Sequence, residues 1–127
     1  MKPATVAQMT VRVCGAVLIV LGILIWTGHF DQFTPVHKFF GIVLVLGLWT
    51  LAFLGARAGL PTGLVVVAVA WGLVAPALGL TQENILTGSW HWLIQVLHLL
   101  IGLGAIGLAE RLGSMIKARP APAARLA

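Results

Sequence analysis

Hydrophobic residues of this chain gather in four long runs that short polar stretches separate. The runs extend over Val13 to Phe30, Phe39 to Ala56, Gly63 to Leu80 and Trp90 to Ala109. Because a helix rises about 1.5 Å per residue, roughly 20 apolar residues cross the hydrocarbon core of a bilayer. We therefore predict an all-α membrane protein with four transmembrane helices in an up-down-up-down bundle.

Composition supports a membrane class over a soluble one. The chain has 127 residues, of which 60% are hydrophobic and 9% are charged, whereas a soluble domain has about 25% charged residues. We expect one transmembrane domain over residues 1–116, opening with an interfacial segment at 1–12. Residues 117–127 are rich in Pro and Ala and are expected to form a disordered cytoplasmic tail.

The placement of Lys and Arg predicts the orientation. In a four-span arrangement seven of the eight cations fall on one side and Lys38 alone falls on the other. The seven are Lys2, Arg12, Arg57, Arg111, Lys117, Arg119 and Arg125. Since cytoplasmic loops carry the excess of positive charge, both termini are expected in the cytoplasm and the chain in the inner membrane. The net charge of +5 then suits anionic lipid head groups, and we do not expect a nucleic-acid partner.

Local signals mark the ends of the predicted helices. Thr34 followed by Pro35 is typical of an N-cap with proline at the first helical position, and Ser89 is a similar candidate for the fourth helix. Pro76 is expected to kink the third helix near Gly72. The gap at Gly72 would be filled by a neighbouring helix or by a bound ring.

Histidines carry the candidate chemistry. His29, His37, His91 and His98 all fall in the outer half of the predicted bundle, where ionisable groups are costly and usually functional. His37 and His98 each precede a glycine by four residues, Gly41 and Gly102. Residues i and i+4 share a helix face, so each imidazole stands beside an open notch. Each half of the chain is thus a helical hairpin whose second helix carries a His-x-x-x-Gly step.

A haem held between the two helices fits this pattern. Haem iron accepts two axial imidazoles from facing helices, and an apolar bundle can enclose the macrocycle. We predict His37 and His98 as the axial ligands, with Gly41 and Gly102 making room.

Further residues complete the predicted haem pocket. Phe39 and Trp92 are expected to supply flat contacts. The propionates would point outward, where Lys38 is the one cation and Gln82 and Asn84 can donate hydrogen bonds.

The depth of the histidines leaves the pairing open. Arg57 lies 20 residues after His37, and Arg111 lies 20 residues after His91. By that measure His98 is about 10 Å deeper than His37. His29 and His91 are therefore alternative ligands, paired as His37 with His91 or His29 with His98.

A short motif resembles a known family. His37-Lys38-x-x-Gly41, followed by Leu44-x-Leu46-x-Leu48-Trp49, resembles the second helix of the bacterial membrane cytochrome b family, and the stretch from His91 to His98 is similar to its later ligand helix. Those proteins are four-helix haem proteins of the inner membrane. The resemblance implies haem b at His37 and electron transfer with a quinol or another small redox partner. This chain is shorter, and its first run has only the terminal His29, which does not support a second haem.

Two other classes of function remain open. A zinc or copper site would need His29, His37 and His91 to converge near Asp31, because His91 and His98 are too far apart along one helix to share an ion. A cofactor-free accessory subunit would instead form a homodimer or join a larger membrane complex through small residues such as Ala105-x-x-x-Ala109.

Hydrolytic chemistry has no support in the sequence. The three acids, Asp31, Glu83 and Glu110, lie at different boundaries, and no nucleophile–base–acid set is present. Cys14 is the single cysteine, which excludes an internal disulfide and a Cys-based zinc or iron–sulfur site.

Overall fold

The computed structural model describes residues 2–120 and is helical throughout, with no strand in that range. The four long helices are α1 (Pro3–Trp26), α2 (Thr34–Arg57), α3 (Thr62–Thr81) and α4 (His91–Lys117), and two short 3₁₀ helices, η1 (Asp31–Phe33) and η2 (Gln82–Asn84), precede and follow the α2–α3 pair. The all-α prediction is confirmed. All four helices are long and apolar enough to cross a membrane, which indicates a multi-pass membrane protein.

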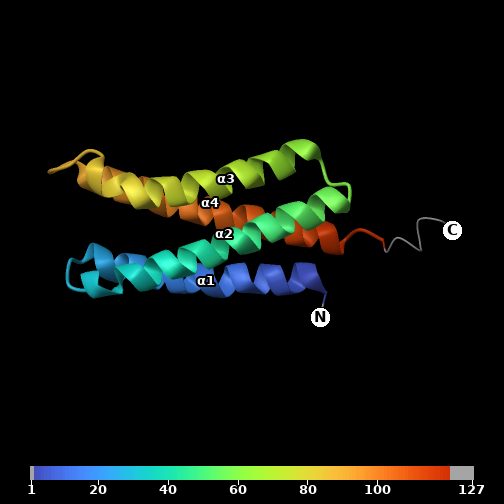
Figure 1. The fold of residues 1–127 in the computed structure, drawn as a ribbon, viewed down its shortest axis with the longest axis horizontal. Helices are drawn as coiled ribbons and strands as arrows, with labels where there is room; N and C mark the ends of the chain where they lie inside the picture. The colour runs from blue at the N-terminus through green and yellow to red at the C-terminus, as the bar shows by residue number, and fades with distance from the viewer. Residues whose placement is uncertain (1, 121–127) are drawn as a thin grey trace.

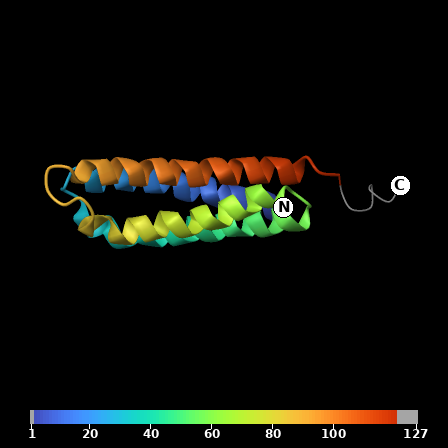
Figure 2. The same cartoon turned by 90° about the horizontal axis from the view of Figure 1, so that it is seen from above.

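The helices lie side by side along one long axis (Figures 1 and 2). The α1–α2 and α3–α4 connections, which contain η1 and η2, lie at one end, called here the η end. The start of α1, the α2–α3 turn and the end of α4 lie at the other end, called here the basic end because Lys2, Arg57 and Lys117 are found there.

The first helix begins earlier than its apolar run predicts. It starts at Pro3, ten residues before Val13, so the segment expected to lie at the interface is helical from Pro3 on. The extra turns are helical because Ala4, Ala7 and Val11 are buried against the bundle.

Two predicted caps are also wrong. Thr34 is the first residue of α2 rather than its N-cap, which is Phe33, and the N-cap of α4 is Trp90 rather than Ser89. Neither helix has a side-chain cap hydrogen bond. At the other end of the chain, α4 includes Lys117, and residues 121–127 of the expected tail lie outside the described residues.

Tight packing is concentrated toward the basic end. Val11, Leu48, Leu51, Ala109 and Leu112 are fully buried there. Small residues let the helix backbones approach closely. A Cβ added at Gly47 would lie only 2.8 Å from Val11 Cγ2, so α1 and α2 fit together only because residue 47 has no side chain.

Two tryptophan side chains hold α3 in contact with α2 and α4. The Trp49 indole of α2 lies against Gly72 and donates a hydrogen bond to the Val69 carbonyl at 3.2 Å. Trp71 lies against Gly104 of α4 and donates to the Ile101 carbonyl at 2.8 Å. The space at Gly72 is therefore occupied by a neighbouring helix. The helix α3 itself continues through Pro76.

A polar cluster joins α1 to α4 near the basic end. Arg12 donates to both oxygens of Glu110, from Nε at 2.6 Å and from Nη2 at 2.8 Å. Gln8, which is 1% exposed, donates to Glu110 Oε2 at 2.8 Å and accepts from the Lys117 ammonium. A buried amide is costly unless its donor and acceptor are both paired, and here both are.

The packing predicts unequal effects of two neighbouring substitutions in α2. Leu48→Ala removes a fully buried side chain, whereas Leu46→Ala removes one that is 54% exposed on the outside of the bundle. Because a cavity is created only in the first case, we expect Leu48→Ala to lower the free energy of unfolding by about 2–5 kcal/mol. Leu46→Ala is the matched control and should have little effect. Reversible unfolding in detergent micelles measures both, and equal losses would contradict the packing described here.

Candidate functional site

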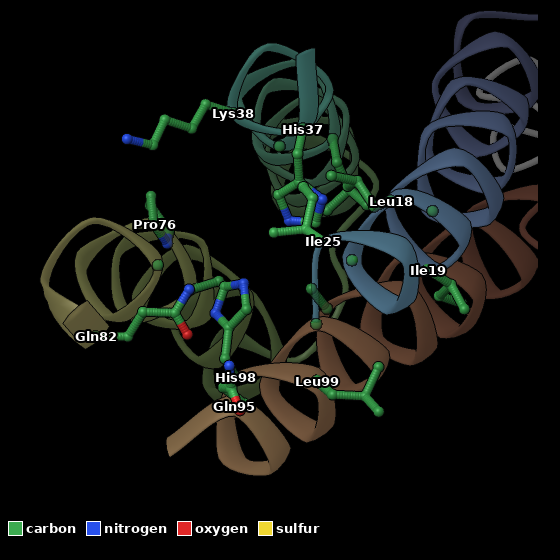
Figure 3. Close-up of a pocket in the computed structure, with 18 of the residues that line it drawn as sticks. Leu18, Ile19, Ile25, His37, Lys38, Pro76, Gln82, Gln95, His98 and Leu99 are labelled. Carbon is green, nitrogen blue, oxygen red and sulfur yellow. The ribbon is translucent and has the colours of Figure 1, made fainter. Parts of the chain in front are cut away.

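A cavity of about 300 Å³ lies between the four helices toward the η end (Figure 3). Its walls come from α1, α2, α3 and α4, and most of the lining side chains are apolar. The polar residues that line it are Thr34, His37, Lys38, Gln82, Glu83, Gln95 and His98. The bundle is thus close-packed at one end and hollow at the other.

The two predicted ligand histidines face each other across this cavity. His37 projects from the first turns of α2 and His98 from α4, on opposite walls (Figure 3). Their ring centres are 6.3 Å apart and the ring planes meet at 50°. A metal–imidazole bond is about 2 Å long, so two imidazoles with one metal ion between them have ring centres roughly 6 Å apart. The observed separation matches that arrangement.

Both rings have a buried nitrogen without a partner. The Nδ1 atoms of His37 and His98 are buried, and neither forms a hydrogen bond within residues 2–120. A buried polar atom without a partner costs about 1–3 kcal/mol. The pair is therefore poorly explained as packing alone.

The glycines that accommodate the rings come from neighbouring helices. A Cβ added at Gly22 of α1 would lie 3.3 Å from His37 Cε1, and one at Gly79 of α3 would lie 2.9 Å from His98 Cε1. Sequence reasoning missed this role, because only the glycines on the same helix as each histidine can be found from spacing.

Gly41 and Gly102 border open space instead. Both line the cavity, and a Cβ added at either would meet nothing within 4 Å. Each histidine therefore has a filled notch on the adjacent helix and an open notch one turn along its own helix. The open notches add to the space of the cavity.

The depth difference predicted between His37 and His98 is absent, because the residue taken as the end of the last helix is not its end. Arg111 is not the end of α4, which continues to Lys117. Twenty positions separate His37 from Arg57, the last residue of α2, and 19 separate His98 from Lys117. Measured from the helix ends, the two histidines lie at the same depth.

The alternative ligands lie elsewhere. His29 Nδ1 is 2.9 Å from the Thr27 carbonyl oxygen, and His91 Nδ1 is 3.2 Å from the Ile85 carbonyl oxygen. Each carbonyl accepts a hydrogen bond from the ring. Neither histidine lines the cavity between the helices.

The predicted pocket residues divide into two groups. Lys38, Gly41 and Gly102 line the cavity, whereas Phe39 and Trp92 do not. Phe39 is 60% exposed and Trp92 is 49% exposed, as suits aromatic rings that face lipid or the membrane interface. Periodicity alone could not separate the two faces, since every face of these helices is apolar.

Sequence reasoning assigns Gln82 only a role toward the propionates and does not place Gln95 in the site. Gln82 does line the cavity, but its side chain points toward the His98 ring (Figure 3). Gln95 lies three residues before His98 in α4 and lines the same cavity. The i, i+3 spacing was the available signal for Gln95.

No larger cluster of metal ligands is assembled. Within residues 2–120 no group of three or more His, Cys, Asp or Glu side chains is placed to hold a metal ion. The convergence of His29, His37 and His91 that a zinc or copper site requires is not seen. Two imidazoles and the open space between them are what the site offers a ligand.

Comparison with models of known protein families, with curated proteins and with solved structures finds no match for this chain.

The cavity predicts opposite responses to leucine at two glycines near His98. Gly79→Leu places a side chain where the imidazole now lies, so we expect a loss of about 1–3 kcal/mol of stability from overpacking. Gly102→Leu, the matched control, enters open space and should leave the stability nearly unchanged or raised. Thermal unfolding of both variants in the same detergent, without added ligand, tests the geometry. Equal destabilisation by the two would mean that the space beside Gly102 is not open.

Proposed function

We propose that this protein is a small membrane cytochrome that binds one haem b between His37 and His98 and transfers electrons. The observation that carries the proposal is the 6.3 Å separation of the two ring centres across an open cavity. That separation suits a metal bound between the two rings. The resemblance of the motif His37-Lys38-x-x-Gly41 to the second helix of the membrane cytochrome b family supports the same choice.

The residues present fit a haem in three respects. Two imidazoles face each other across the cavity, two glycines leave the flanking space open, and aliphatic side chains form the walls. A haem when bound supplies one-electron chemistry through its iron. His37 and His98 would hold it from α2 and α4.

The protein contributes exclusion of water and placement of charge. Leu18, Ile19 and Leu99 are among the apolar residues of the lining, and an apolar wall keeps solvent from the metal and tunes its potential. Lys38 is the cation at the cavity and suits a propionate, while Glu83 lies nearby in the lining.

The proposed orientation places the η end outside the cell and the basic end in the cytoplasm, with the four helices alternating in direction across the inner membrane. The cations at the basic end support it, since positive charge is enriched on the cytoplasmic side. Lys38 is at the η end, and Arg125 lies outside the described residues. The haem would then lie in the outer half of the membrane, within reach of a quinol or a small redox partner.

Removal of either imidazole tests whether His37 and His98 bind a haem. We expect the purified wild-type protein, made with ample haem supply, to show a Soret band and a sharp reduced α-band. His37→Ala and His98→Ala should abolish the low-spin spectrum, because iron then loses an axial ligand. Absorption spectra of the oxidised and dithionite-reduced protein, with haem quantified per chain, are the measurement.

His29→Ala and His91→Ala are the matched controls and should keep the spectrum, since both rings bond to backbone carbonyls outside the cavity. A colourless wild-type protein that contains zinc or copper by elemental analysis would contradict the haem proposal and favour a zinc or copper site. A colourless protein without metal would favour the cofactor-free accessory subunit.

The orientation has an independent test. A fluorescent protein that folds only in the cytoplasm, fused after Ala127, should be bright, and alkaline phosphatase fused at the same place should be inactive. Phosphatase needs disulfides that form only outside the cytoplasm. Both reporters placed instead at Gly88, in the α3–α4 connection, should give the reverse result. The opposite pattern at the two positions would invert the proposed topology.

A further inference from the structure

We infer that Gln82 is a positioning residue for His98, in which the amide oxygen of Gln82 accepts a hydrogen bond from the His98 Nδ1–H and so orients the imidazole toward the haem iron. The inference rests on the proposed function and adds a difference between the two axial ligands.

The two side chains have complementary unpaired atoms. Within residues 2–120 only three buried side-chain atoms lack a hydrogen-bond partner: His37 Nδ1, His98 Nδ1 and Gln82 Oε1. An imidazole N–H is a donor and an amide oxygen is an acceptor. Both His98 and Gln82 line the same cavity. His98 can therefore supply the donor and Gln82 the acceptor of one hydrogen bond.

Their placement on the backbone brings them together. The His98 ring packs against Gly79, where an added Cβ would lie 3.6 Å from Nδ1. Gln82 follows Gly79 by three residues, at the junction of α3 and η2, and residues i and i+3 share a helix face. Figure 3 shows the Gln82 amide pointing toward the His98 ring.

A metal-bound imidazole needs such an acceptor. When one ring nitrogen binds a metal, the other almost always donates its N–H to an oxygen, and this bond fixes the ring and makes the ligand more basic. If Nε2 of His98 binds the iron, Nδ1–H is directed at an acceptor, and Gln82 Oε1 is the buried one without a partner.

The other ligand lacks an equivalent. His37 packs against Gly22 of α1, and the residue three positions after Gly22 is Ile25, which also lines the cavity. An isoleucine cannot accept a hydrogen bond. Gly22 with Ile25 thus corresponds to Gly79 with Gln82 of the second hairpin, and only the second pair includes a hydrogen-bond acceptor in its side chain.

The test is the midpoint potential of the haem in the full-length protein, measured by redox titration of the α-band. Loss of the acceptor makes His98 a weaker donor to ferric iron, so Gln82→Leu should raise the potential and weaken haem binding about tenfold or more. Gln82→Glu keeps an acceptor and adds negative charge, so it should lower the potential. A merely structural role would not give shifts of opposite sign.

Two further variants sharpen the result. Gln95→Leu is the matched comparison, because Gln95 lines the same cavity but has no buried unpaired atom, and it should change the potential and the haem affinity less than Gln82→Leu does. Ile25→Gln should give His37 the same support and lower the potential.

The outcomes separate the two proposals. A wild-type protein that binds no haem defeats the proposed function and the inference with it. A haem whose potential and affinity are the same in wild type and Gln82→Leu overturns the inference and leaves the cytochrome standing. A shift in Gln95→Leu in place of Gln82→Leu also overturns it. If Gln82→Leu fails to fold by circular dichroism, the sign of the shift in Gln82→Glu decides.

Discussion

Close packing of small residues at the basic end determines how the rest of the bundle is arranged. Gly47 admits Val11, and Gly113 admits the buried amide of Gln8, so α1 approaches α2 and α4 closely there. The ion pair of Arg12 with Glu110 adds a polar connection between α1 and α4. Helices fixed at one end by such contacts need not close at the other, and the cavity lies toward that other end. A membrane bundle can hold such a space because lipid gives no hydrophobic drive to collapse it.

The cavity brings two imidazoles into a mostly apolar space, and this juxtaposition is hard to maintain without a ligand. Each ring has a buried nitrogen with no partner in the described part of the chain, and unpaired polar groups are most costly where the surroundings are least polar. Each ring nevertheless packs against a glycine of a neighbouring helix, His37 against Gly22 and His98 against Gly79. Both features are consistent with a site shaped for a bound group rather than with a core that tolerates two histidines.

The sequence predicts the four helices because twenty-residue apolar runs leave few alternatives. It also gives His37 and His98 as candidates from the glycine one turn after each, and both of these glycines border the open space of the cavity. Contacts between helices cannot be predicted from the sequence, so the positions of Gly22 and Gly79 beside the imidazole rings were not foreseen. The sequence also could not show that Phe39 and Trp92 point away from the cavity, since uniformly apolar helices carry no periodic signal. The depth comparison failed because Arg111 was treated as a helix end, whereas the helical residues after it extend α4 to Lys117.

The two hairpins repeat one arrangement and then depart from it at one residue. In each, the first helix supplies a glycine that receives the ring, and the second supplies the histidine and an open glycine four residues later. The repeat places the two rings at equal depth and opposite each other, as two axial ligands of one metal must be. The departure is at Ile25 and Gln82, three residues after the receiving glycines. Under the proposed function, such a bundle of two like halves would hold one cofactor between ligands that differ in basicity, and the difference would be set by a residue that need not touch the cofactor.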